Sequence, residues 1–246
     1  MKFSANLGFL WKDLSLPDAI RAAKAAGFDA VECHLPYDVD PSDVRAALAE
    51  TGLPMLGLNT VHGAPGIPGL AAVPGGEAEA RAAIDQALDY AQATGTEAVH
   101  VLAGFSSGPR AHEAFLSNLT YAAEKAGDRM ILIEPLNPYD APGYFLNATD
   151  QAVALIREVG APNVKLMFDC YHVQSIEGDV TRRLARHLPL IGHIQVAAVP
   201  DRGAPDHGEL DYGYVFREIA ALGWTKPIGA EYRPAGATED TLSWMG

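Results

Sequence analysis

The chain has 246 residues, of which 48% are hydrophobic, and it carries a formal net charge of −13 from 18 basic and 31 acidic residues. This charge argues against a nucleic-acid partner, because phosphate binding needs a basic footprint, and also against attachment to an anionic membrane surface. Two cysteines, Cys33 and Cys170, do not suggest a disulfide framework and fit a reducing compartment. The N-terminus lacks a signal-peptide pattern, and no apolar run approaches the ~18 residues of a membrane span. We therefore expect a cytoplasmic, globular protein.

Short apolar runs alternate with longer alanine-rich segments of helical period along the whole chain. The expected strands are Phe3–Leu7, Ala30–Cys33, Met55–Asn59, Ala98–Leu102, Met130–Glu134, Val164–Asp169, Ile191–Val196 and Pro227–Tyr232. The expected helices lie near Leu16–Ala26, Pro41–Glu50, Glu77–Thr94, Arg110–Ala126, Thr149–Val159, Gly178–His187 and Tyr212–Ala221, with a partial one at Glu239–Trp244.

Strict alternation of strands and helices predicts parallel strands joined by crossovers. Eight such units in a chain of this length predict an α/β fold, a (β/α)8 TIM barrel in a single domain spanning residues 1–246. A doubly wound open sheet is the alternative, but no glycine-rich phosphate fingerprint follows the first strand.

Several helix boundaries have local signals. Gly27 and Gly95 follow expected helix ends, where a left-handed residue is common. Pro17 and Pro41 stand at helix starts, where a missing N–H costs little. The Thr149-Asp150 pair is expected to cap the helix that follows it.

Polar residues at the C-terminal ends of the strands are the candidates for function, because that face carries the active site of a barrel. In the stretch RMILIEPLN (residues 129–137), Glu134 follows four apolar residues and would be costly to bury unpaired. Glu134, Asp169, Gln195 and Glu231 end four consecutive expected strands at similar depth. Their oxygens predict a site for Mg²⁺ or Mn²⁺. The alternative for each residue alone is a helix cap or a loop ion pair.

Seven stretches of the sequence together resemble hydroxypyruvate isomerases, a branch of the xylose-isomerase-like TIM barrels close to the 2-oxo-tetronate isomerases. They are FSANL, FDAVECHLPYD, LIEPLNPYDAPGYFL, FDCYHVQSIEGD, IGHIQVA, HGELDY and GAEYRP. The resemblance covers nearly the whole chain. It implies a divalent-metal-dependent isomerase with metal ligands Glu134, Asp169, Gln195 and Glu231, and with Glu134 and Glu231 as the catalytic acid–base pair. The loop after the third strand, NTVHGAPGIPG, lacks the tryptophan and the charges usual in this family.

Hydroxypyruvate and tartronate semialdehyde differ by a carbonyl that moves between adjacent carbons. We expect one glutamate to remove a proton and the other to return one through an enediolate, without nicotinamide or flavin. His172, Arg202, Glu209 and Asn59 are the candidates for substrate binding; for each, ordinary rim packing is the alternative. The remaining strand histidines, His62, His100 and His193, are expected in the core or at the rim.

Three alternatives share this pattern. The chain could be a 2-oxo-tetronate isomerase or a ketose 3-epimerase on the same barrel, or a barrel that binds a sugar acid without turnover. An apurinic endonuclease of the superfamily would need a basic groove, which the charge disfavours. In every remaining case the expected partner is a small keto acid or sugar acid, and exposed loop aromatics leave room for a homo-oligomer.

Overall fold

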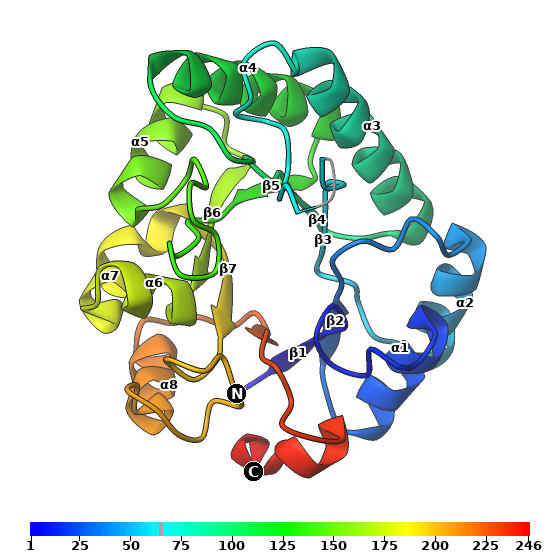
Figure 1. Ribbon diagram of the computed structural model, residues 1–246. Helices are drawn as coiled ribbons and strands as arrows, with labels where there is room; N and C mark the ends of the chain where they lie inside the picture. The colour runs from blue at the N-terminus through cyan, green and yellow to red at the C-terminus, as the bar shows by residue number, and fades with distance from the viewer. Residues whose placement is uncertain (64–65) are drawn as a thin grey trace.

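The computed structural model describes residues 1–63 and 66–246, and within them eight parallel strands form one sheet in the order β2-β1-β8-β7-β6-β5-β4-β3. Figure 1 shows the helices as a ring around these strands. The two ends of the sheet meet where Val31 pairs in parallel with Met55 and where the Cys33 N–H donates to the Gly57 carbonyl at 3.1 Å. The sheet therefore closes, and the expected (β/α)8 barrel is confirmed.

The strands are β1 (Phe3–Asn6), β2 (Ala30–Glu32), β3 (Gly57–Asn59), β4 (Ala98–His100), β5 (Met130–Ile133), β6 (Val164–Asp169), β7 (Ile191–Val196) and β8 (Ile228–Ala230). The helices are α1 (Leu16–Ala25), α2 (Pro41–Thr51), α3 (Glu77–Thr94), α4 (Pro109–Ala126), α5 (Thr149–Val159), α6 (Cys170–Ile176), α7 (Val180–His187) and α8 (Tyr212–Ala221). All eight strands fall inside the runs predicted from the sequence.

Apolar side chains are buried on both faces of the sheet, as a parallel barrel surrounded by helices requires. Phe168 on β6 and Phe115 on α4 are fully buried, and both cysteines are free and buried. Among the described residues, no helix has the length and apolar character that crossing a bilayer would require.

The helix count differs from the expectation. Helix α6 begins directly after β6, where the Asp169 Oδ1 accepts the Tyr171 N–H at 2.9 Å and caps the helix. Its seven residues are too few to show a helical period in the sequence. The predicted final helix is instead two short 3₁₀ turns, Thr238–Thr241 and Ser243–Met245.

The predictions of helix boundaries have different outcomes. Gly27 and Gly95 adopt positive φ after helix ends, as predicted. At the start of α5 the prediction is wrong: Thr149 does not cap the helix, because Ala148 is the N-cap and has no capping side chain. Instead the Thr149 N–H and Oγ1 donate to the Glu177 Oε2, at 3.2 and 2.6 Å. Glu177 follows α6, so α5 is capped by a residue remote in sequence.

The Glu177 cap is testable. Glu177→Ala removes the acceptor of two α5 hydrogen bonds and a contact to Arg183 at 3.3 Å, and we expect it to lower the free energy of unfolding by about 1–2 kcal/mol. Urea unfolding followed by circular dichroism measures this. Exposed Glu124→Ala on α4 is the control and should change stability by less than about 0.5 kcal/mol. Equal stability of both variants would contradict the remote cap.

Candidate functional site

A cavity of about 350 Å³ opens at the C-terminal ends of the strands, the face where barrels carry their active sites. Its lining contains both apolar and ionisable side chains. The ionisable residues in the lining are His34, His62, His100, Glu134, Asp140, His172, Arg202, Glu231 and Arg233. The cavity thus brings together residues from five of the eight strand ends and from the loops that follow them.

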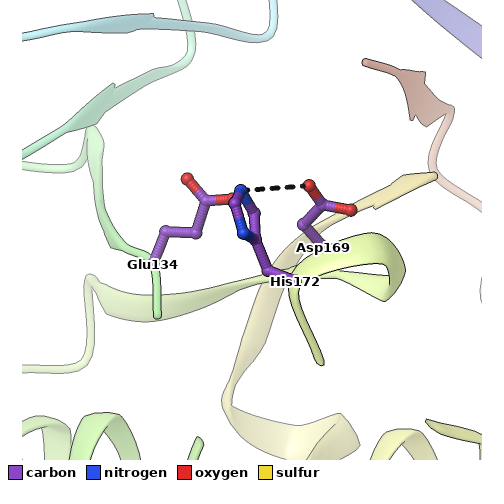
Figure 2. Close-up of side chains that lie close together, drawn as sticks. All are labelled: Glu134, Asp169 and His172. Atoms are coloured by element: carbon purple, nitrogen blue, oxygen red, sulfur yellow. Dashed lines mark ion pairs between the residues drawn. The ribbon is translucent and has the colours of Figure 1, made fainter. Parts of the chain in front are cut away.

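Glu134, Asp169 and His172 form a buried cluster deep in this region (Figure 2). Glu134 directly follows β5, Asp169 ends β6, and His172 lies in the first turn of α6. The His172 Nε2 is 3.7 Å from the Asp169 Oδ2 and 3.9 Å from the Glu134 Oε1. The short helix α6 therefore delivers a histidine to the two carboxylates.

The hydrogen bonding of His172 decides which ring nitrogen carries hydrogen. Its Nδ1 accepts the Asn137 backbone N–H at 3.0 Å, so a neutral ring must be protonated on Nε2. Burial, reinforced by the charge of Arg202, lowers the pKa of His172 to about 3 and keeps the ring neutral. Its Nε2–H therefore points at the carboxylates as a donor, which suits substrate binding better than metal binding.

Three oxygens at this end of the barrel are buried and accept no hydrogen bond. They are the Glu134 Oε1, the Asp169 Oδ2 and the Gln195 Oε1. Asp169 and Gln195 face each other in the register of β6 and β7. Buried polar atoms are normally paired, so a group of unpaired oxygens calls for a ligand. Carboxylate and amide oxygens are the donors that Mg²⁺ and Mn²⁺ prefer, and these residues fit such an ion.

Arg202 and Glu231 form the second half of the site. The Arg202 Nη2 lies 2.9 Å from the Glu231 Oε2 and 3.7 Å from the Asp169 Oδ2. The guanidinium lies between the rings of Phe9 and Tyr171, with its central carbon 4.8 and 4.9 Å from the ring centroids. Arg202 is only 9% exposed, so it compensates the carboxylates from within the protein.

The two glutamates have opposite electrostatic environments. Burial, reinforced by the charges of Glu231 and Asp169, raises the pKa of Glu134 well above its usual range. Burial acts the same way on Glu231, but Arg202 and a 2.8 Å contact from His34 outweigh it and hold the pKa of Glu231 below its usual range. Two carboxyl groups whose pKa values are pushed apart are typical of an acid–base pair.

The structure brings most of the predicted site residues to one region. Asn59 and His172 line the cavity together with Glu134, Glu231 and Arg202. Asp169 contacts His172 and Arg202 at 3.7 Å, and Gln195 pairs with Asp169 in the strand register. Glu209 does not join them: it is exposed, absent from the cavity lining, and its backbone N–H donates to the Val199 carbonyl.

Sequence reasoning did not assign site roles to His34, Asn6 or Asp140. His34 and Asn6 both contact the Glu231 Oε1, at 2.8 and 3.1 Å. Their positions at or just after strand ends are a signal that could have found them. Asp140 lies in the loop after β5 and is 3.4 Å from Arg202, a contact that only the path of that loop decides.

Comparison with known proteins identifies the family to which this barrel is similar. The profile of the family described as "Xylose isomerase-like TIM barrel" matches residues 20–246. A 2-oxo-tetronate isomerase of Cupriavidus necator is 44% identical over 99% of this chain and 97% of its own length. The hydroxypyruvate isomerase of Escherichia coli is 37% identical over 100% of this chain and 98% of its own length.

A solved structure from Brucella melitensis, described as an AP endonuclease of family 2, superposes with a TM-score of 0.95. It is 37% identical and covers 99% of this chain and 97% of its own. The family and the fold therefore rest on full-length similarity.

Replacing Arg202, the buried cationic side chain of the site, should destabilise the protein in the absence of metal. Arg202→Met leaves Glu231 and Asp169 without their compensating charge, and we expect a loss of about 3 kcal/mol in the free energy of unfolding at neutral pH. Arg233→Met is the matched control. Arg233 is exposed and makes no ion pair with any residue in 1–63 or 66–246, so its removal should cost less than about 0.5 kcal/mol. Unfolding curves without metal that coincide for the two variants would refute this compensation.

Proposed function

Because this chain belongs to the xylose isomerase-like TIM barrel family, we propose that it is a divalent-metal-dependent isomerase of short 2-keto acids that interconverts hydroxypyruvate and tartronate semialdehyde. The observation that carries the proposal is the pairing of two buried glutamates, Glu134 and Glu231, with the group of unpaired oxygens between their strands. Isomerase activity as a class is supported by full-length relatives with that name.

Glu134, Asp169, Gln195 and Glu231 would hold Mg²⁺ or Mn²⁺, which as a Lewis acid would stabilise negative charge on the substrate oxygens. Three of the four offer oxygens that are buried without a hydrogen bond, and Glu231 offers a carboxylate that is balanced by Arg202. A set of oxygen donors without cysteine favours these hard ions over zinc.

The protein's own residues would carry the proton transfers. One glutamate removes a proton from C3 of hydroxypyruvate, and the other returns a proton to C2, while the hydroxyl proton passes from the C3 oxygen to the C2 oxygen. The product is tartronate semialdehyde, and no electrons leave the substrate. Glu134 follows β5 and Glu231 follows β8, so they approach the cavity from different strands and exchange roles with the direction of reaction.

The substrate carboxylate needs a cation, and two arginines line the cavity. Arg202, the residue predicted from the sequence, already contacts three carboxylates, Glu231, Asp169 and Asp140. Arg233, two residues after Glu231, lines the same cavity from its exposed mouth. We therefore assign the binding of the substrate carboxylate to Arg233. Arg202 would keep Glu231 in place, and His172 would donate a hydrogen bond to a substrate oxygen.

A 2-oxo-tetronate is the second candidate substrate. Its isomerisation is the same chemistry on a chain with one more carbon, and the relative with 44% identity carries that name. The loop after β3, which lines the cavity through His62, Gly66 and Pro68, borders the space that the extra carbon would need. Cleavage of nucleic acid is a weaker candidate despite the name of the Brucella structure, because a chain of net charge −13 repels a polyanion.

Deuterium exchange tests the proposal. The protein with Mg²⁺ in D2O should incorporate deuterium into hydroxypyruvate and form tartronate semialdehyde, both visible by proton NMR. Glu134→Gln and Glu231→Gln should each slow this by about 10²–10⁴-fold, because each removes one proton-transfer group. Glu113→Gln, an exposed residue of α4, is the control and should leave the rate unchanged.

Four outcomes would decide against all or part of the proposal. Activity that survives both substitutions would refute the two-glutamate mechanism, and activity that survives metal removal would refute the metal. Binding of hydroxypyruvate without exchange would favour a non-catalytic barrel. Exchange with a 2-oxo-tetronate but not with hydroxypyruvate would move the substrate to the second candidate.

The role of Arg233 is tested by comparing charged and neutral substrates. Arg233→Met should raise KM for hydroxypyruvate by about 10-fold or more with kcat little changed, because it removes charge-assisted hydrogen bonds to the carboxylate. Dihydroxyacetone, which has a hydroxymethyl group in place of the carboxylate, serves as the control, and any slow conversion of it should be unaffected. An equal effect on both compounds would contradict carboxylate binding by Arg233.

A further inference from the structure

Glu32 is a buried carboxylate at the end of β2 that the proposed reaction does not use. It is 4% exposed, and it reaches across the barrel interior to β7. Its Oε1 lies 2.7 Å from the Gln195 Nε2, and its Oε2 lies 2.7 Å from the His193 Nε2. A buried carboxylate is costly unless it is hydrogen-bonded, and the His193 ring supplies one of these hydrogen bonds. The contact to Gln195 is then the one that reaches the proposed metal site.

The Glu32 carboxylate determines which end of the Gln195 amide faces the cavity. An ionised carboxylate only accepts hydrogen bonds, so Gln195 must turn its NH₂ group toward Glu32. The Gln195 Oε1 then points the other way, and it is buried there without a hydrogen-bond partner. The two ends of a side-chain amide have nearly the same shape, so packing alone would not prevent the NH₂ group from facing a cation.

A second side-chain amide, that of Asn6, links Glu32 to Glu231, one of the two proposed catalytic glutamates. The Asn6 Nδ2 lies 3.1 Å from the Glu32 Oε1 and 3.1 Å from the Glu231 Oε1. The Asn6 Oδ1 accepts the Gly8 N–H at 2.9 Å, which fixes the direction of this amide as well. Glu32 therefore holds two amides: that of Gln195, itself a proposed metal ligand, and that of Asn6, which also contacts the proposed ligand Glu231.

Gly229 on β8 leaves the space through which Glu32 reaches Gln195. A Cβ at this position would lie 2.7 Å from the Glu32 Oε1 and 2.8 Å from the Gln195 Cγ, closer than real Cβ contacts come. Gly229 also pairs with Gln195 in the strand register. The absence of a side chain at Gly229 is thus a separate sign that the approach of Glu32 to Gln195 is built into the barrel.

We propose that Glu32 is a positioning residue that orients the Gln195 amide so that its oxygen, and not its nitrogen, faces the divalent cation. The inference rests on the metal site of the proposed function, but not on the identity of the substrate or on turnover. Partners that orient metal ligands typically affect metal affinity by 10–100-fold.

Manganese binding to the metal-free protein tests this inference, with free Mn²⁺ measured by electron paramagnetic resonance. Glu32→Leu removes both acceptors and should raise the Mn²⁺ Kd by about 10–100-fold. Glu32→Gln is the conservative control. Its amide oxygen can still accept from the Gln195 Nε2, so its Kd should stay close to that of the unchanged protein.

A double-mutant cycle separates orientation of Gln195 from general stability. Gln195→Leu removes the ligand that Glu32 orients, so adding Glu32→Leu to it should not weaken Mn²⁺ binding further. Additive effects of the two substitutions would overturn the proposal, as would a Glu32→Leu protein that binds Mn²⁺ normally.

If Glu32→Leu does not fold, Gly229→Ala decides the question. The added methyl group would crowd the Glu32 Oε1 and the Gln195 Cγ and displace their contact while both side chains stay in the chain, so it should raise the Mn²⁺ Kd; an unchanged Kd would overturn the proposal. These results are independent of catalysis. Weak Mn²⁺ binding by Glu32→Leu alongside an inactive parent protein would support the inference and refute the keto-acid substrate. Normal Mn²⁺ binding by Glu32→Leu alongside an active parent protein would overturn the inference and support the keto-acid substrate.

Discussion

Four carboxylates are buried inside one barrel, and the cost of burying their charge governs the rest of the site. Glu32, Glu134, Asp169 and Glu231 are each no more than 6% exposed. An isolated buried carboxylate must be paired, neutralised or bound to a metal. The barrel meets this requirement differently for different groups. His193 pairs with Glu32, and Arg202 pairs with Glu231. Burial raises the pKa of Glu134 and also that of Asp169, to about 8, which favours the neutral form of both side chains. A divalent cation would be a further solution for these last two carboxylates.

Arg202 is placed by the loop after β7 with unusual backbone geometry. Its φ is 57°, a left-handed value that is uncommon for a residue with a side chain. The Arg202 N–H donates to the Ala198 carbonyl at 2.9 Å, and the Arg202 carbonyl accepts the Arg233 N–H at 2.8 Å. Such strain costs about 1–3 kcal/mol and persists where the surroundings determine it. Here it places the Arg202 guanidinium beside three carboxylates and connects Arg233, at the cavity mouth, to the same loop.

The site is organised in two layers along the barrel axis. The upper layer holds the two glutamates and His172, which line the cavity, and Arg202, which pairs with Glu231. The lower layer holds Glu32, His193 and Asn6, and the Asn6 amide connects Glu32 to Glu231 in the upper layer. A ligand set on rigid strands with a hydrogen-bonded layer below it keeps its geometry without the substrate, which is the arrangement that metal-dependent catalysis needs.

The barrel and the grouping of its four strand-end oxygen donors could be predicted from local patterns in the chain. Alternation of apolar strands with alanine-rich helices is a local pattern, and the C-terminal ends of parallel strands must meet on one face, so Glu134, Asp169, Gln195 and Glu231 could be grouped from their positions alone. The remaining contacts of the site depend on how the chain packs in three dimensions. The contacts of Arg202 depend on a loop path, Glu177 caps a helix that precedes it by 28 positions, and Glu32 reaches Gln195 across the barrel because Gly229 has no side chain. These contacts join residues far apart in the chain, and no local pattern or period encodes such distances.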